Sequence, residues 1–249
     1  MAKDLFSSHA ADYAKFRPTY PLSCIEYISS FAQNKDCALD CATGNGQAAL
    51  LLANFFDRVY ATDLSQQQIE SANSHPRIIY SVSPAESTSF ADDTFDAVTI
   101  AQAYHWVNHK KFCDEAKRIG KNNGIVAVIG YNLFRSTNKE VTKLIHHFYH
   151  NVTDPYWEPE RKYVEELYQT TPFYFDEVPV TESFKMQTQW SIDHVAGYIN
   201  TWSAIKKFIK QNGFNPVDEL MLAVKKVWGS EEILEFDFPL GLRIGKISK

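Results

Sequence analysis

A short run with two glycines, Leu39 to Gly46 (LDCATGNG), has the residue types that a nucleotide-like cofactor requires. Glycine lets a ligand approach the backbone where a side chain would collide. A helical pattern begins at residue 47, and the N-terminus of a helix offers free N–H groups and positive potential. The spacing Gly44-x-Gly46-x-x-Ala49 also satisfies the dinucleotide-binding pattern, so the glycines alone leave the ligand class open.

Asp40, near the end of the strand that leads into the two glycines, separates two ligand classes by charge. A dinucleotide carries a pyrophosphate, which a neighbouring carboxylate repels. S-adenosylmethionine carries an amino group and a sulfonium cation instead, and an adjacent carboxylate suits both. Asp40 therefore favours S-adenosylmethionine over a dinucleotide. The alternative interpretation is that Asp40 only caps the turn after the strand.

Three further polar residues follow predicted strands. Asp63 can accept two hydrogen bonds from a ribose diol, although it could also cap the helix that begins near residue 65. Glu86 follows the third strand, where a cofactor base could lie, and Gln102 follows the fourth. We expect all three to meet Asp40 at one edge of a sheet, because ligands in such sheets bind outside the carboxyl ends of the strands.

Apolar strands and helical patterns alternate through the first half of the chain. We expect strands over residues 37–41, 58–62, 77–82, 95–101 and 124–131, and helices over residues 22–31, 47–56, 65–74 and 109–119. This alternation is typical of right-handed βαβ units and of a doubly wound sheet of parallel strands.

The pattern changes after Asn132. Helical segments are expected over residues 138–150, 193–211 and 216–228, and extended segments within 173–190 and 233–248. We expect the parallel sheet to gain its last strands from these extended segments, with the helices over its edge. No linker separates a second unit, so residues 1–249 are predicted to form a single domain.

Composition restricts the partners of the chain. A formal net charge of −5 and a pI near 5.9 argue against binding to nucleic acid. No apolar stretch is long enough for a membrane span or a signal peptide, which predicts a cytoplasmic protein without a membrane partner. The four cysteines lack metal-ligand spacing, and no nearby acidic residue completes a ligand set with His146 and His150, so no metal site is expected.

Beyond the glycine run, short motifs mark the whole chain. They are Tyr13-x-x-x-Arg17-Pro18-x-Tyr20-Pro21, Asp40-x-Ala42-x-Gly44-x-Gly46, Ala61-Thr62-Asp63-Leu64-Ser65, Ala85-Glu86, Phe95-Asp96, Ala103-Tyr104-His105-Trp106 and Thr201-Trp202-Ser203. With these motifs the sequence resembles the class I S-adenosylmethionine-dependent methyltransferases (methyltransferase type 11), and within them the branch that includes trans-aconitate methyltransferase.

The resemblance implies a fold and a cofactor. The fold would be α/β and Rossmann-like, with a doubly wound, mostly parallel seven-stranded sheet and helical cap elements. A cofactor-binding core would cover residues 36–132, an N-terminal lid residues 1–35, and acceptor-side helices would lie within 133–230. The cofactor would be S-adenosylmethionine, with S-adenosylhomocysteine as its product.

The resemblance also assigns cofactor contacts. These would come from Tyr13, Arg17, Asp40, Ala42, Gly44, Gly46, Asp63, Leu64, Ala85, Glu86 and Gln102. Asp40 and Gly44 would face the methionine end, Asp63 the ribose and Leu64 the adenine, and Gly46 would allow close approach. The family often has glycine where Ala42 stands, and we expect its extra methyl group to be tolerated.

The acceptor side is predicted from position. His105 follows the fourth strand and is the candidate for acceptor positioning or proton removal, because histidine titrates near neutral pH. Arg135 could hold an acceptor carboxylate through its planar fork, or be a surface arginine. The remaining acceptor-side candidates are Tyr20, Tyr104, Trp106 and Trp202, and Trp157 and Trp190 could bound the same pocket.

These observations favour methyl transfer from S-adenosylmethionine to a small-molecule acceptor, a carboxylate or a hydroxyl, by direct displacement. Two alternatives remain: an NAD(P)-dependent oxidoreductase, which the glycine spacing permits, and a non-catalytic cofactor-binding protein. The sequence leaves the acceptor, the methylated atom and the oligomeric state open.

Overall fold

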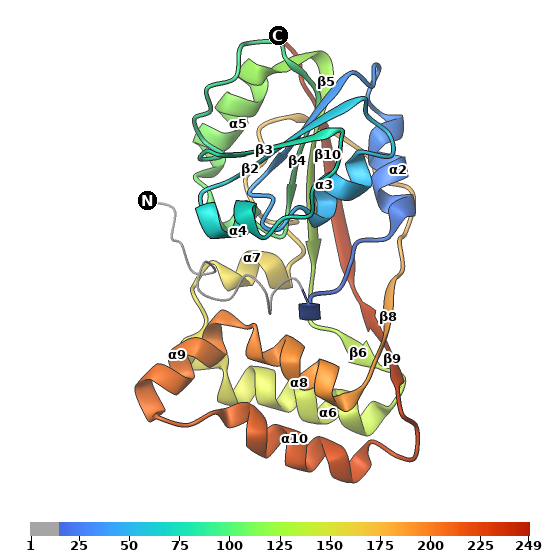
Figure 1. Ribbon diagram of the computed structural model, residues 1–249, viewed down its shortest axis with the longest axis vertical. Coiled ribbons are helices and arrows are strands. Elements are labelled where there is room, and N and C mark those ends of the chain that lie inside the picture. The colour runs from blue at the N-terminus through green and yellow to red at the C-terminus, as the bar shows by residue number, and fades with distance from the viewer. Residues whose placement is uncertain (1–14) are drawn as a thin grey trace.

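The computed structural model describes residues 15–249, and a seven-stranded sheet organises the upper part of the molecule in Figure 1. The strand order is β3-β2-β1-β4-β5-β10-β7. The strands are β1 (Cys37–Cys41), β2 (Arg58–Asp63), β3 (Ile78–Val82), β4 (Phe95–Ala101), β5 (Gly120–Tyr131), β7 (Asp176–Val178) and β10 (Leu240–Lys246). Strands β1 to β5 pair in parallel, whereas β10 is antiparallel to both of its neighbours. The predicted α/β class with a mostly parallel sheet of seven strands is confirmed.

Helices cover both faces of this sheet. Alternate strand residues such as Ala38 and Ala97 share a core with α2 (Leu22–Ser30) and α3 (Gln47–Leu52). Their neighbours Leu39 and Val98 share a second core with α5 (His109–Ile119). Burial on both faces explains why β4 is apolar almost throughout, as central strands of parallel sheets are. The short helix α4 (Gln66–Glu70) joins β2 to β3.

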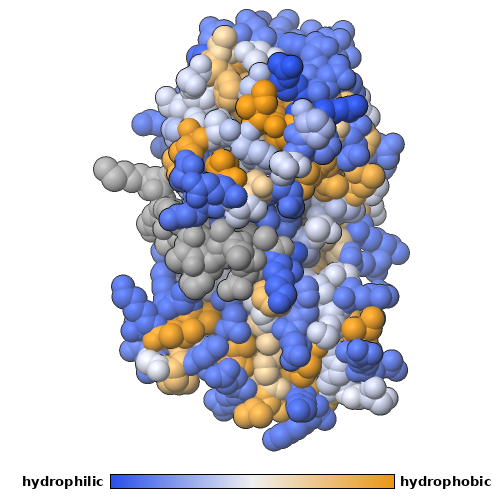
Figure 2. All heavy atoms as spheres, viewed as in Figure 1, coloured by the Kyte–Doolittle hydropathy of each residue, from blue (hydrophilic) through white to orange (hydrophobic). Residues whose placement is uncertain are grey.

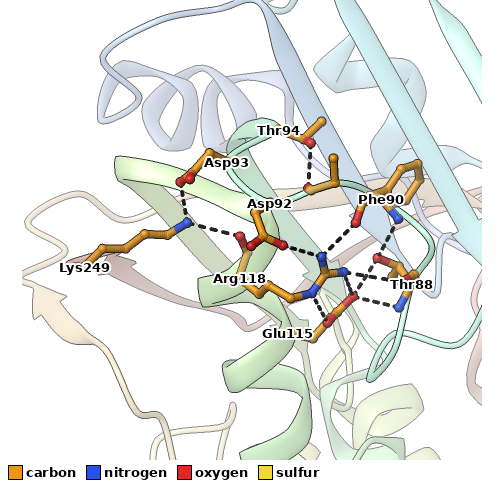
Figure 3. A network of polar contacts seen from close by, with 9 residues as sticks. Thr88, Phe90, Asp92, Asp93, Thr94, Glu115, Arg118 and Lys249 are labelled. Carbon is orange, nitrogen blue, oxygen red and sulfur yellow. Dashed lines mark hydrogen bonds and ion pairs between the residues drawn. The ribbon is translucent and has the colours of Figure 1, made fainter.

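The loop between β3 and β4 is held by charged side chains of α5 (Figure 3). Arg118 donates to the carbonyl oxygen of Phe90 at 2.8 Å and to Glu115 at 2.7 Å. Glu115 in turn accepts hydrogen bonds from the backbone N–H and the hydroxyl of Thr88, at 2.7 and 2.6 Å. This network fixes the segment that brings Ala85 to the edge of the sheet.

The lower part in Figure 1 is mainly helical. Its helices are α6 (Lys139–His147), α8 (Ile192–Asn200), α9 (Ser203–Asn212) and α10 (Pro216–Val227), with the π-helical turn η3 (Phe148–Val152) after α6. The short helix α7 (Arg161–Glu165) lies between the two parts in Figure 1, and the chain also forms the short helices η2 (Tyr104–Trp106) and η4 (Asp154–Tyr156). The single helix expected over 193–211 is wrong, because Trp202 has an extended backbone (φ −69°, ψ 135°) and separates α8 from α9.

The other late strands form a separate antiparallel sheet of three strands, which the sequence did not predict. It has the order β6-β9-β8 and consists of β6 (Arg135–Ser136), β8 (Met186–Trp190) and β9 (Leu234–Phe238). Only β7 and β10 join the main sheet. Along β9, buried and exposed residues alternate, which is typical of an antiparallel strand with one solvent face. On the buried side of β9, the ring of Phe236 packs against Phe134 and Trp190.

The surface of the described part is mixed. Figure 2 shows hydrophobic groups dispersed among hydrophilic ones on the face in view. Among residues 15–249 no helix combines the length and the apolar character that a membrane crossing requires.

Candidate active site

A cavity of about 140 Å³ lies at the carboxyl ends of β1, β2 and β4. Most of the predicted cofactor contacts line it: Arg17, Asp40, Ala42, Gly44, Asp63, Leu64, Ala85, Glu86 and Gln102. Of the predicted acceptor residues, Tyr20 and Trp106 also line it. Gly46 does not, and Tyr13 lies outside the described residues. The strand ends thus bring together Asp40 and Gln102, which are 62 positions apart in sequence.

Asp40 is fully buried, but it lies in the wall of the cavity. Its two carboxylate oxygens accept hydrogen bonds from the hydroxyls of Thr43, at 2.5 Å, and of Thr99, at 2.9 Å. Thr99 lies directly opposite Asp40 in the parallel pairing of β1 with β4. Within residues 15–249 no lysine, arginine or histidine forms an ion pair with this carboxylate.

The isolation of this carboxylate from cations has an electrostatic consequence. Burial, with a smaller contribution from the charge of Asp63, raises the pKa of Asp40 to about 6. The hydrogen bonds from the two threonine hydroxyls oppose this increase. Burying a carboxylate without a cation is costly, so such a group gains from a cationic ligand. The positively charged amino group and sulfonium of S-adenosylmethionine suit this carboxylate, whereas a negatively charged pyrophosphate does not.

The glycine run follows a left-handed path that places backbone against the cavity. Ala42, Gly44 and Gly46 have φ angles of 51°, 58° and 88°. A Cβ on Gly44 would meet nothing closer than Gln68 Oε1 at 3.9 Å, so the space beside Gly44 is open to the cavity. Gly46 is required for another reason than the predicted approach of a ligand, because a Cβ there would lie 2.3 Å from the hydroxyl oxygen of Tyr80.

Ala42→Gly is expected to stabilise the protein without its ligand. A left-handed conformation costs an L-residue about 1–2 kcal/mol, whereas glycine adopts it freely but adds about 0.4–1 kcal/mol of unfolded-state entropy. We expect the free energy of unfolding, measured in urea, to rise by about 0.5 kcal/mol. Ala48→Gly removes the same methyl group from the right-handed helix α3 and should destabilise. An equal loss of stability in both variants would contradict the strain at Ala42.

Asp63 organises the other end of the run. Its oxygens accept hydrogen bonds from the backbone N–H groups of Gly44 and Ser65, both at 2.9 Å. Asp63 also lines the cavity, where its carboxylate can face a bound ligand. Leu64 beside it is 44 % exposed, as a platform for a flat apolar group would be. Glu86 accepts from the backbone N–H of Asn108 at 3.0 Å.

Gln102 is bound to a strand backbone. Its side-chain amide donates to the carbonyl oxygen of Tyr131 at 2.9 Å and accepts from the N–H of Tyr131 at 2.8 Å. The Tyr131 hydroxyl accepts a hydrogen bond from Arg17 at 3.1 Å. Gln102 and Arg17 are thereby held where they line the first cavity and also a second, smaller one.

The second cavity, of about 40 Å³, adjoins the first through Arg17, Gln102 and Trp106. Its other lining residues are His105, Trp157, Glu158, Arg161, Tyr198, Trp202 and Ser203. Aromatic rings therefore form much of its wall, and Glu158 is paired with Lys207 at 2.8 Å.

His105 lies in the wall of this second cavity and is 7 % exposed. Its Nδ1 lies 2.7 Å from the hydroxyl oxygen of Tyr168. Burial, together with the positive charge of Arg161 and the nearby His109, lowers the pKa of His105 well below its usual value. At neutral pH the imidazole is therefore uncharged and a weak base.

Two predicted acceptor residues lie elsewhere. Arg135 is an exposed residue on β6 and lines neither cavity, because β6 pairs with β9 at the edge of the small sheet. Tyr104 is fully buried and donates its hydroxyl to the carbonyl oxygen of Pro172 at 2.6 Å. It packs in the core below the cavities.

Arg161 is the cavity residue that sequence reasoning missed most clearly. Its guanidinium carbon lies 4.6 Å from the ring centroid of Trp157, and its Nε donates to the hydroxyl of Tyr149 at 2.7 Å. Its terminal nitrogens donate no hydrogen bond to any of residues 15–249. No helical pattern joins Trp157 to Arg161, because the backbone at Trp157 is extended and α7 begins only at Arg161. Across the same residues, no group of three or more His, Cys, Asp or Glu side chains could hold a metal.

Comparisons with known proteins match this site to a family. A family model described as a methyltransferase domain matches residues 39–128, which include the end of β1 and the whole of β2 and β4. A Dictyostelium discoideum protein named as a methyltransferase is 32% identical over 250 residues, covering 98% of this chain and 95% of its own length. A Geotalea uraniireducens ubiquinone/menaquinone biosynthesis C-methyltransferase is 33% identical over 122 residues, which are 45% of this chain and 51% of that protein.

A solved structure extends the match to the helical part. It is described as a type II methyltransferase from Anaeromyxobacter dehalogenans, with 36% sequence identity and a TM-score of 0.86, and the alignment covers 94% of this chain and 99% of that one. These matches do not single out the trans-aconitate branch, and they do not favour the oxidoreductase alternative. The chain belongs to the methyltransferase family and is an S-adenosylmethionine-dependent methyltransferase.

Proposed function

We propose that the protein transfers a methyl group from S-adenosylmethionine to a carboxylate oxygen of a small organic acid. The observation that carries the proposal is Arg161 in the wall of the second cavity, whose terminal nitrogens donate to none of residues 15–249. The volume of about 40 Å³ suits a small acceptor or one end of a larger one. Residues shared by both cavities support direct contact between acceptor and methyl donor.

The first cavity is proposed to hold the cofactor. Asp40 would bind its cationic amino acid end, Asp63 its ribose hydroxyls and Leu64 its adenine. The pairing is supported by the buried carboxylate of Asp40, which forms no ion pair with a cation among residues 15–249, by the position of Asp63 in the cavity wall, and by the exposed apolar side chain of Leu64. When bound, the cofactor supplies a methyl carbon that the adjoining sulfonium activates.

The proposed acceptor chemistry requires positioning more than proton transfer. An ionised carboxylate has no proton to lose, and alignment alone can supply about 7–11 kcal/mol of the barrier reduction. Arg161 offers the planar fork that grips a carboxylate through two parallel hydrogen bonds. A hydroxyl acceptor would need a base with a pKa near neutrality, and burial of His105 lowers its pKa away from that range. We therefore propose that His105 contacts the acceptor as a positioning group.

A rate assay tests this function. Release of S-adenosylhomocysteine is followed with small aromatic and aliphatic carboxylic acids, each paired with its primary amide. We expect turnover of acids without turnover of their amides, at a rate that is independent of pH between about 7 and 9. The rate should fall below pH 6, because protonation of Asp40 (pKa about 6) removes the charge that binds the cofactor. A rate that rises through pH 7–9, or equal turnover of amides, would refute a carboxylate acceptor.

A further inference from the structure

The π-helical turn η3 places one tyrosine against residues that line the second cavity. The turn follows α6 directly, and Tyr149 within it is 1 % exposed. Turns of this kind are rare and are frequent at functional sites, because the extra residue redirects the side chains that follow. Here it places Tyr149 among the rings of Trp157 and Trp202, whose centroids lie 5.3 and 5.6 Å from its own.

The hydroxyl of Tyr149 connects two charged residues of α7. It donates to Oε1 of Glu165 at 2.6 Å and accepts from Nε of Arg161 at 2.7 Å. Burial raises the pKa of Tyr149 far above its usual value, so the hydroxyl stays neutral and can fill both roles. The direction of both bonds is thus defined, because a carboxylate can only accept and an arginine can only donate.

These contacts fix the plane of the Arg161 guanidinium. One face lies against Trp157, at 4.6 Å from carbon to centroid, and the Nε edge is held by Tyr149. A planar group that is fixed on one face and at one edge has little freedom left. Its remaining edge carries both terminal nitrogens, which donate to no group in residues 15–249. That edge is available to the second cavity, which Arg161 lines.

We propose that Tyr149 and Glu165 are positioning residues that set acceptor specificity by holding Arg161 in the orientation that receives a carboxylate. This inference rests on the proposed function, since it assigns the acceptor group to Arg161. It adds that selectivity for an acid over its amide depends on a hydroxyl that the acceptor does not need to touch. Pre-organisation of this kind improves binding by reducing the ordering that binding would otherwise require.

Tyr149→Phe tests the inference because it removes one oxygen and keeps the ring. We expect the KM for the carboxylic acid to rise about tenfold, with kcat at saturation and the affinity for S-adenosylmethionine changed less than twofold. Glu165→Gln retains an oxygen acceptor for the tyrosine hydroxyl and should stay close to wild type. Tyr156→Phe is the matched control, because its hydroxyl bonds to Asn212 on α9 and not to Arg161. A KM shift in Tyr156→Phe equal to that in Tyr149→Phe would overturn the assignment.

A second measurement needs no acceptor. Hydrogen exchange of the Arg161 Nε–H, followed by nitrogen-15 NMR and assigned by its loss in Arg161→Lys, should be slow in the wild type and at least tenfold faster in Tyr149→Phe. Unchanged exchange and unchanged KM would refute the positioning role while acid turnover still supported the proposed function. Faster exchange in a protein that does not distinguish acids from amides would refute the proposed function itself.

Discussion

Asp40→Asn is expected to make the unliganded protein more stable and at the same time to prevent cofactor binding. Because burial raises the folded-state pKa of Asp40 to about 6, above the usual value of 3.8, the folded protein binds this proton more strongly than the unfolded chain does. Stability therefore falls as the pH rises from about 4 to 6, and the cost of the ionised group is fully present at pH 7.5. Asparagine removes that charge, and we expect the free energy of unfolding to rise by up to about 3 kcal/mol.

The same substitution removes the proposed partner of the cofactor's cationic end. Truncating one member of a buried charge pair costs about 2–5 kcal/mol, so the Kd for S-adenosylmethionine should rise about 100-fold or more in calorimetric titration. The wild-type affinity should fall as the pH drops through about 6, whereas the affinity of the variant should not follow this titration.

Asp96 provides the matched control for Asp40. It is a buried aspartate on the neighbouring strand β4, but it has a cation, Lys121, at 2.9 Å, and it accepts the backbone N–H of Cys37 at 2.9 Å. Asp96→Asn should therefore lower the stability and leave the cofactor affinity unchanged. If Asp40→Asn instead lost stability as Asp96→Asn does, the argument from an unpaired buried charge would fail.

Arg161→Met is expected to affect the acceptor and not the cofactor. Methionine retains an unbranched apolar side chain against Trp157 but offers no donor to a carboxylate. Loss of a bidentate charged contact should raise the KM for the acid about 100-fold, with the Kd for S-adenosylmethionine within twofold of wild type. Steady-state kinetics with an acid and direct titration of the cofactor separate the two effects.

Arg135→Met is the control for Arg161→Met. The sequence left Arg135 open as a group that holds an acceptor carboxylate or as a surface arginine, and this residue is exposed on β6 and lines neither cavity. Its replacement should leave both constants unchanged. If the KM rose in Arg135→Met and not in Arg161→Met, the placement of the acceptor would be reversed.

The α/β part of the fold could be predicted because its signals are local. Strands β1 and β4 were predicted with their observed bounds, and β2 to within one residue, since each is a short apolar run between turn residues. The separate sheet of β6, β8 and β9 could not be placed this way. Its existence depends on packing against Phe134, about 100 residues before β9, and the alternation along β9 does not say which sheet the strand joins.

The candidate site likewise contains residues that the sequence predicted and residues that it did not. Asp40 and Asp63 were found because they end consecutive parallel strands, and topology alone brings such ends together. Arg161 was not found, because its position depends on Tyr149 in a π-helical turn and on a stacked tryptophan, neither of which leaves a periodic pattern. Arg135 was chosen for its nearness to the end of β5, but pairing of β6 with β9 directs that segment away from the cavities.

The position of the transferred methyl group tests the account most directly. The protein is incubated with S-adenosylmethionine bearing a trideuterated methyl group and a mixture of small carboxylic acids, phenols and amines, and the products are analysed by mass spectrometry before and after treatment with hydroxide. We predict a labelled methyl ester that hydroxide converts to the free acid with loss of the label as methanol. A label that stays on a phenol, an amine or a carbon after this treatment would contradict the assignment of the acceptor.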